Sequence, residues 1–258
     1  MKNLSYARRT TNESLCLELI MNNQNLSRAD LSNLTGLTKA TISVIVKKLI
    51  EDHLVLETGI GSSGNAGGRK PIILKYNGKA GLSISIDVGY NYINALLSYL
   101  DGEEIRIIQK KPIMLDEKEV KAYCSEIFAS FEENLPKTSY GVIGVVVAVH
   151  GPVYNGELIF TPHLNLEHIA FREIIEEISD YPVYLENEAN LSALGEYTFT
   201  SNSSSLISVN MHSGIGAGIV INGELQVGSH GIAGEIGHQI IVIDGEKCAC
   251  GNDGSIEM

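Results

Sequence analysis

The chain has 258 residues, of which 44% are hydrophobic and 19% charged, so it can bury a substantial core and favours two domains. It holds no apolar run of membrane-spanning length, no N-terminal signal-peptide pattern and only four cysteines, which excludes a disulfide framework and predicts a soluble cytoplasmic protein. The net charge of −12 is uneven, because residues 1–78 hold 10 Lys or Arg against 6 Asp or Glu, whereas the remainder holds 9 against 25.

Three short helices are predicted at the start of the chain. The first covers residues 12–22, whose larger apolar side chains share one face. The second begins after Ser27, because Asp30 follows three residues later and the two side chains form a capping box. It ends near Gly36, since glycine tolerates the left-handed backbone of a helix C-cap.

A third helix and a hairpin follow. Thr38 caps a helix from Lys39 to about Glu51, which carries its apolar residues on one face. Residues 54–57 and 71–74 are predicted to be two short strands, joined by a glycine-rich loop with a basic end. This order is typical of a winged helix-turn-helix. We therefore expect residues 1–78 to form a basic DNA-binding domain on an acidic body.

The outward face of the third helix supplies the short polar and basic side chains that a major-groove reader needs. Lys39 and Ser43 are candidate base contacts, and Lys47 and Lys48 are candidate phosphate contacts. The full predicted set is Lys39, Thr41, Ser43, Lys47, Lys48, Arg69 and Lys70, with the last two placed to enter a minor groove. A trihelical packing module with solvated lysines is the alternative.

From residue 79 the pattern changes to strands alternating with helices, which favours an α/β domain over residues 79–258. Strands are predicted at 82–88, 93–100, 104–110, 142–149, 205–211, 216–221 and 239–243, and helices at 116–135, 167–179 and 189–199. Asn187 and Glu188 follow a short strand, at the end where α/β proteins collect ligands. A loop or helix-capping role explains these two residues equally well.

Seven motifs occur in one order along the chain, at residues 27–49, 67–71, 86–94, 186–190, 213–218, 234–238 and 248–254. Together they resemble the ROK group of repressors, open reading frames and sugar kinases, and within it the xylose repressors of Gram-positive bacteria. The specific part is Gly-Glu-Ile-Gly-His followed by Cys-x-Cys-Gly, because each glycine loop alone is common. The resemblance implies an actin-like (ribonuclease H-like) sugar-kinase-type domain of two α/β lobes, with sugar bound in the cleft.

The resemblance also transfers two sets of site residues. The sugar-binding positions are Gly151, Asn165, Asn187, Glu188, Glu235, His238 and Glu257. His238, Cys248 and Cys250 match three zinc ligands, whereas the fourth family ligand, a cysteine, is Ser255 here. The fourth ligand is a water, Asp253 or absent. The alternative is that two reduced thiols and a histidine lie close together without a metal.

Kinase activity is not expected. Family kinases carry Asp at the position of Glu188, and they carry Asp-x-Gly-Gly-Thr where this chain has residues 87–91 with the bulky Tyr90. The longer carboxylate displaces the proton acceptor by roughly 1 Å, and a misplacement of that size can cost about a hundredfold in rate. The expected function is a sugar-responsive repressor of a xylose operon that binds operator DNA. A ROK sugar kinase with an accessory DNA-binding head and a DNA-binding fragment without a sensor are the alternatives.

The resemblance further predicts an incomplete second lobe, because family members continue beyond the cysteine motif. A fragment of a longer chain, a truncated gene and a shortened regulator all explain such a length. A homodimer is expected if the C-terminal part is supplied.

Overall fold

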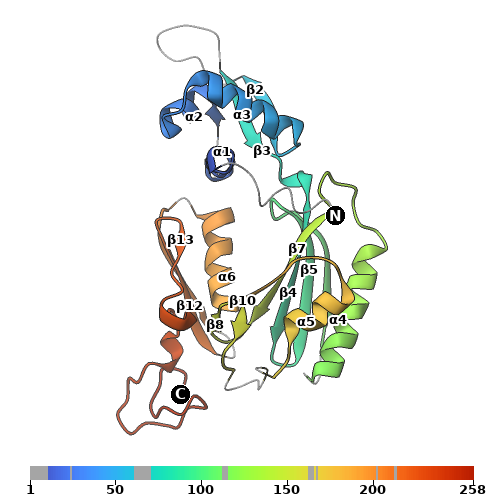
Figure 1. Cartoon of the computed structure of the whole chain (residues 1–258). Helices are drawn as coiled ribbons and strands as arrows, with labels where there is room; N and C mark the ends of the chain where they lie inside the picture. The colour runs from blue at the N-terminus through green and yellow to red at the C-terminus, as the bar shows by residue number, and fades with distance from the viewer. Residues whose placement is uncertain are drawn as a thin grey trace. The chain divides into compact units, whose positions relative to one another are not determined.

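The computed structural model describes residues 11–23, 25–60, 71–111, 116–161, 166, 168–201, 203–211 and 214–258 (Figure 1). The chain divides into two compact units. One contains Met1–Leu82, Tyr99–Glu103 and Pro136–Ile143, and the other contains Ser83–Ser98, Glu104–Leu135 and Gly144–Met258. The domain boundary between residues 78 and 79 stays a prediction. Among the described helices, none is long and apolar enough to cross a membrane.

The first unit contains the predicted winged helix-turn-helix. Its helices are α1 (Thr11–Asn22), α2 (Arg28–Thr35) and α3 (Lys39–Glu51). A three-stranded sheet of order β1-β3-β2 accompanies them, formed by β1 (Leu26–Ser27), β2 (Val55–Ile60) and β3 (Ile72–Tyr76). Both pairings in this sheet are antiparallel, so β2 and β3 form the wing. The predicted order of helices and hairpin is confirmed.

The local signals at the ends of α2 act as predicted. The Ser27 hydroxyl accepts a hydrogen bond from the Asp30 amide at 3.3 Å, and the Ser27 amide donates to the Asp30 carboxylate at 2.8 Å. Gly36 closes the helix in the left-handed conformation, with φ of 73°. Thr38 caps α3 by accepting from the Thr41 amide. The end of α2 and the start of α3 are therefore both fixed by local capping residues, Gly36 and Thr38.

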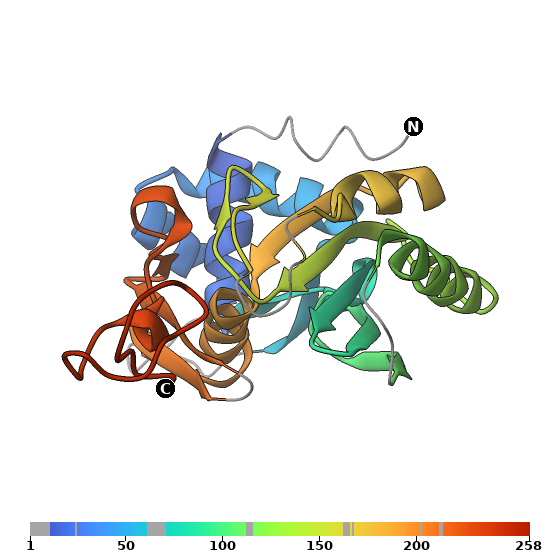
Figure 2. The same cartoon turned by 90° about the horizontal axis from the view of Figure 1, so that it is seen from below.

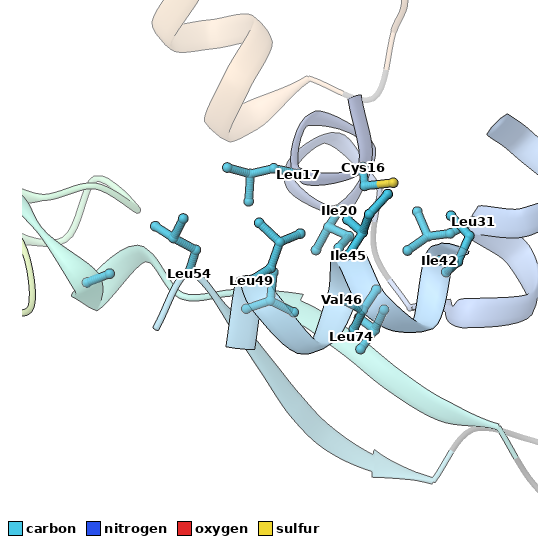
Figure 3. Packing of buried hydrophobic residues seen from close by; sticks show 12 residues of the cluster. Cys16, Leu17, Ile20, Leu31, Ile42, Ile45, Val46, Leu49, Leu54 and Leu74 are labelled. Carbon is cyan, nitrogen blue, oxygen red and sulfur yellow. The ribbon is translucent and has the colours of Figure 1, made fainter. Parts of the chain in front are cut away.

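The apolar face of α3 forms the centre of the core of the winged helix-turn-helix, which we call the head. Figure 3 shows Ile42, Val46 and Leu49 from α3 packed with Cys16 and Ile20 from α1. Leu31 from α2 and Leu74 from β3 complete the cluster, so all three helices and the wing share one core. Burying such side chains contributes about 1.5–3 kcal/mol each.

One ion pair joins α1 to α3. Lys48 Nζ donates to both carboxylate oxygens of Glu13, at 2.7 and 2.8 Å, and Glu13 is buried. A buried carboxylate is costly without a partner, so this pair is part of the head's packing.

The second unit contains a five-stranded sheet of order β10-β7-β4-β5-β6. Its strands are β4 (Leu82–Gly89), β5 (Tyr92–Tyr99), β6 (Glu104–Lys110), β7 (Val142–Val149) and β10 (Val183–Asn187). β10 runs parallel to β7, and β5 runs antiparallel to β6. Two helices, α4 (Glu117–Glu132) and α5 (Phe171–Ile178), pack beside each other along one face of this sheet (Figure 2).

A second sheet carries the other half of this unit. It consists of β11 (Leu206–Met211), β12 (Ile215–Ile221) and β13 (Glu224–Leu225), all antiparallel. Helix α6 (Glu188–Gly195) packs against β11 and β12 and continues as a π-helical turn over Glu196–Thr200. A Cβ on Gly218 of β12 would lie 2.2 Å from the Ala189 carbonyl oxygen, so the helix approaches the sheet as closely as glycine permits. The small hairpin β8 (Val153–Tyr154) and β9 (Glu157–Leu158) follows β7.

The strand predicted at 239–243 is wrong. Ile240 forms only an isolated bridge with Ser255, and the amides of Ile241 and Val242 both donate to the Gly254 carbonyl. Ile243 is 88% exposed. An apolar run resembles a strand in sequence, but it forms one only when a neighbouring strand supplies hydrogen-bond partners. Here those partners come from a turn in the loop that carries Cys248 and Cys250, which we call the cysteine loop. The helix predicted at 167–179 begins only at Phe171, and the one predicted at 189–199 ends its α-helical part at Gly195.

The capping box yields a stability prediction. Ser27→Ala removes the hydroxyl, and we expect it to lower the free energy of unfolding by about 1 kcal/mol at neutral pH, the usual worth of an N-cap. Hydrogen bonds from the Ser27 hydroxyl and amide lower the pKa of Asp30, so their stabilisation is present above the ordinary pKa and is lost as pH falls through the lowered one. Urea unfolding followed by circular dichroism between pH 2.5 and 7 measures both effects. Asn33→Ala on the exposed face of α2 is the control, and an equal loss in both variants contradicts the capping role.

Candidate functional site

Helix α3 presents the predicted polar residues on its outward face. Lys39, Ser43 and Lys47 are exposed, as a DNA-reading face requires. Thr41 is half-buried, and its hydroxyl lies 2.9 Å from that of Thr38 in the helix cap. The Ser43 hydroxyl donates to the Lys39 carbonyl at 2.8 Å. With Lys48, four of the five predicted residues of α3 are therefore exposed, and their contact with DNA stays a prediction.

Lys48 differs from the other predicted DNA contacts. Its ammonium is held by the buried Glu13 carboxylate, so releasing it to a phosphate would leave that carboxylate unpaired. This geometry argues against the predicted phosphate contact at Lys48. Arg69 and Lys70 lie outside the described residues.

The second unit contains a cavity of about 520 Å³. It lies among the carboxyl end of β7, the start of α6, β12 and the loops around the cysteines. Six of the seven predicted sugar-binding residues line it: Gly151, Asn187, Glu188, Glu235, His238 and Glu257. The seventh, Asn165, lies outside the described residues. Residues from distant parts of the sequence thus converge on one pocket of the size that small-molecule sites have.

Asn187 holds the base of the pocket together. Its Oδ1 caps α6 by accepting from the Asn190 amide at 3.1 Å, and its Nδ2 donates to the Gly151 carbonyl at 2.9 Å. A carboxamide has a further donor hydrogen and a further lone pair. Asn187 is therefore a helix cap, which was the alternative role predicted for it, and it still has a donor hydrogen and a lone pair for a ligand.

Glu188 is held at the pocket wall by an amide. Its Oε1 accepts from Asn210 Nδ2 at 2.6 Å, and its Oε2 lies 4.0 Å from His150 Nδ1. This arrangement makes Glu188 a fixed acceptor for a ligand hydroxyl.

His150 lies between two carboxylates. Its Nε2 lies 3.5 Å from Asp87 Oδ1 and 3.3 Å from the Tyr92 hydroxyl, and its Nδ1 faces Glu188. Burial lowers the pKa of His150, but the hydrogen bond to Asp87 and the negative charges of Glu188 and Asp87 outweigh it and raise the pKa above its usual value. Burial and the same carboxylates raise the pKa of Tyr92, so its phenol stays protonated.

His238 joins the pocket to the cysteine loop. Its Nδ1 lies 3.4 Å from Glu257 Oε2 and 3.6 Å from Cys248 Sγ, whereas its Nε2 faces Glu235 at 4.0 Å. Glu257 Oε1 accepts from the Ile215 amide at 2.8 Å, which fixes that carboxylate. Burial raises the pKa of Glu235, and the charge of nearby Glu257 adds to this, although His238 opposes it.

The predicted zinc ligands come together. One donor atom from each of His238, Cys248 and Cys250 lies within 4.8 Å of the others. Burial would raise the pKa of the Cys248 thiol, but hydrogen bonds from Ser255, Cys250 and His238 lower it to about 6. Apart from this weak contact with the thiol, the buried Ser255 hydroxyl has no hydrogen-bond partner among the described residues. Two thiols, an imidazole and an otherwise unpartnered hydroxyl fit a zinc ion with three strong protein ligands.

Three residues around the pocket escaped the sequence analysis. His150 follows the long apolar strand and could have been noticed as the polar residue at its carboxyl end. Asn210 lies in the middle of β11, and nothing in the sequence indicates that it reaches Glu188, 22 residues away. Phe160 contributes an apolar wall from a segment that the sequence left unassigned.

Comparison with known proteins identifies the architecture. Residues 83–258 match the model of the ROK family, and residues 17–55 match a winged helix-turn-helix DNA-binding domain. The chain belongs to the ROK family. The ROK match covers the whole pocket, including the glycine loop, the Gly-Glu-Ile-Gly-His motif and the cysteines, so the expected fold class is confirmed.

Individual relatives agree with this assignment. The chain is 39% identical to the xylose repressor of Bacillus subtilis over 251 residues, which are 96% of this chain and 65% of that protein. A putative xylose repressor of Caldicellulosiruptor is 39% identical, over 95% of this chain and 62% of its own length. The chain thus spans slightly less than two thirds of the curated relatives it matches.

Solved structures of a transcriptional regulator and of a sugar kinase are both similar to this chain. A ROK family transcriptional regulator, described as a homologue of the Escherichia coli MLC protein, has a TM-score of 0.75 at 29% identity, covering 95% of this chain and 63% of that one. A ROK glucokinase from Streptomyces griseus in complex with glucose and AMPPNP has a TM-score of 0.60 at 29% identity, covering 69% and 56%.

The position of His150 yields a prediction about pH. Because the pKa of His150 is raised in the folded protein, its stabilisation is fully present below the ordinary histidine pKa of 6.5 and is lost as pH rises through the raised value. We expect His150→Gln to flatten the decline in melting temperature across this window, relative to the parent chain. Thermal unfolding at a series of pH values measures it, with His53→Gln as the control. Identical pH profiles for the parent and His150→Gln contradict the assignment.

Proposed function

We propose that the protein is a sugar-responsive transcriptional repressor that binds operator DNA through its head and a neutral sugar, xylose, in the ROK pocket. The observation that carries this proposal is the presence in one chain of an exposed basic face on α3 and a pocket of carboxylates and amides. The 39% identity to the Bacillus xylose repressor over nearly the whole chain supports both the activity and the sugar. Such a regulator works in the cytoplasm, where the DNA is.

The chemistry of the pocket supports a sugar ligand. A sugar presents several hydroxyl groups, and each one needs a fixed acceptor or donor. Glu188, Glu257 and Asn187 are each held by a hydrogen bond that leaves further lone pairs facing the cavity. Pre-organised acceptors of this kind bind without a large ordering cost.

Sugar phosphorylation is the alternative function, favoured by the likeness to the glucokinase and by the glycine loop at 214–218. Phosphoryl transfer needs a positioned base and a cradle for phosphates and Mg²⁺. Here Glu188 Oε1 already accepts a hydrogen bond from Asn210 at 2.6 Å, so this oxygen is engaged by the protein and is not free to accept a proton from a substrate hydroxyl. Tyr90 lines the pocket from the loop where family kinases carry a small residue. Both features favour a sensor over an enzyme.

Regulation requires that the sugar bind one conformation of the protein better than another. The change in DNA affinity can then be no larger than that difference in sugar affinity. A homodimer would add a second head, so that two half-sites are read together. We infer a homodimer for the complete regulator, because winged helix-turn-helix repressors gain specificity in this way.

The first experiment tests DNA binding and sugar response together. The chain is titrated by fluorescence anisotropy against duplexes from the upstream region of its own operon, with and without xylose. We expect binding at modest salt that xylose weakens by about tenfold, a coupling typical of allosteric regulators. Asn187→Asp keeps the helix cap but loses the Nδ2 donor, so it raises the xylose concentration needed for release by roughly tenfold.

Three outcomes separate the hypotheses. Release by xylose and not by an equal concentration of sorbitol supports the repressor. DNA binding that every sugar leaves unchanged indicates a DNA-binding protein without a sensor. Phosphate transfer from ATP to a pentose or hexose at an ordinary enzymatic rate establishes the kinase and rejects the proposal.

We further propose that His238, Cys248 and Cys250 bind a zinc ion, which when bound cross-links the cysteine loop to the histidine at the pocket. The support is the convergence of three donors and the unsatisfied Ser255 hydroxyl at their side. A neutral hydroxyl is a weak zinc ligand, so affinity is expected to be lower than for a site with three cysteines.

Substitution at Ser255 tests the zinc proposal. Ser255→Cys supplies a third thiolate, and we expect it to tighten zinc binding by about tenfold or more. Cys250→Ser is expected to abolish stoichiometric binding. Competition with a chromophoric chelator measures the affinities, and elemental analysis of the purified chain measures the content. Equal zinc affinity in the parent chain and Cys250→Ser rejects the site.

A further inference from the structure

The outward face of α3 carries two apolar side chains that the core does not use. Val44 is 70% exposed, although Ile42, Ile45 and Val46 of the same helix are buried. Ala40 is also exposed, one helical turn before Val44. Residues four apart lie on the same face of a helix, so the two side chains form one small apolar strip.

Polar and positive groups surround this strip. Ser43 lies next to it, three residues after Ala40, and Lys47 lies three residues after Val44. Lys39 begins the helix on the same side. Helix α3 contains three lysines and one acidic residue, Glu51, which lies 3.7 Å from Lys47, so the helix as a whole is positive. A positively charged surface is complementary to the phosphates that line a DNA groove, and this fixes the class of partner.

The chemistry of the strip selects among base pairs. In the major groove, the C5-methyl group of thymine is the apolar feature of the base edges, and apolar groups such as the alanine side chain and the threonine methyl pack against it. Ser43 already donates its proton to the Lys39 carbonyl, so it offers its lone pairs rather than a hydrogen to a base. The face therefore suits adenine-thymine pairs, read by methyl contacts and flanked by lysines.

We propose that Val44 and Ala40 are specificity-determining residues that read thymine methyl groups in the operator. This inference rests on the proposed DNA-binding function and adds the kind of base that the helix selects. Val44 contributes the larger contact because its two methyl groups extend beyond the Cβ that it shares with Ala40.

Removing a single methyl group from the DNA tests the proposal. Duplexes that bind the full chain are first selected from a random pool, and each thymine is then replaced by uracil, which lacks the methyl group but pairs identically. We expect one or two positions at which this replacement weakens binding of the parent chain by about three- to fivefold, the worth of one buried methyl group. At the position that Val44 reads, Val44→Ala and the isosteric Val44→Thr each lose at least one methyl contact, so uracil is expected to weaken their binding less than it weakens binding of the parent chain.

Two control variants separate this effect from others. Met21→Ala removes an exposed apolar side chain from α1, and it is expected to leave the uracil effect unchanged. Lys47→Ala is expected to weaken all duplexes alike and to reduce the slope of log affinity against log salt by about one. Circular dichroism confirms that each variant is folded.

The outcomes distinguish this inference from the function on which it rests. If no duplex is selected at all, the proposed DNA-binding function fails. If duplexes are selected but uracil costs the parent chain nothing, or costs the Val44 variants as much as the parent, the reading of thymine by Val44 is overturned while DNA binding stands.

Discussion

Asn187 occupies the junction between β10 and α6, and the geometry of the pocket depends on its two hydrogen bonds. One of them starts α6, and the other ties that start to Gly151 at the end of β7. Because β7 and β10 are parallel neighbours, their carboxyl ends meet at this point. Gly218 then allows α6 to lie directly on β12, which carries the glycine loop on the other side of the cavity. A single polar side chain and one glycine thus set the distance between the two walls.

The same junction determines what Glu188 can do. As the first residue of α6, it lies where the helix dipole favours negative charge. Asn210 of β11 holds Oε1 by a hydrogen bond, and His150 at the end of β7 lies 4.0 Å from Oε2. A carboxylate held in place in this way offers fixed lone pairs to the hydroxyl groups of a ligand. The hydrogen bond from Asn210 also occupies an oxygen that a general base would use.

The sequence predicted the elements whose signals are local. Ser27, Asp30, Gly36 and Thr38 act within four residues of their partners, so the head was placed almost to the residue. Long-range contacts were beyond such reasoning. The pairing of Lys48 with Glu13 joins residues 35 apart, so no local pattern in the sequence indicates that a predicted phosphate contact is also part of the packing of α1 on α3. Motif resemblance, rather than periodicity, identified most of the pocket, whereas the role of Asn210 is visible only once the strands are placed. The wrongly predicted strand at 239–243 shows that a local signal can also mislead, because an apolar run without a partner strand stays in a loop.

The charges around the cavity also bear on whether the pocket suits a neutral sugar or a phosphorylated one. Among its described lining residues are three carboxylates, Glu188, Glu235 and Glu257, and no lysine or arginine. Two negative charges about 4 Å apart repel by roughly 4 kcal/mol at the effective dielectric near a protein surface. A neutral sugar avoids this repulsion and gains hydrogen bonds from the same groups, whereas a sugar phosphate incurs it. Kinases offset the repulsion with Mg²⁺ and an open phosphate loop. In this chain Tyr90 lines the pocket from that loop, and together with the carboxylates it supports the proposal that the pocket takes a neutral sugar.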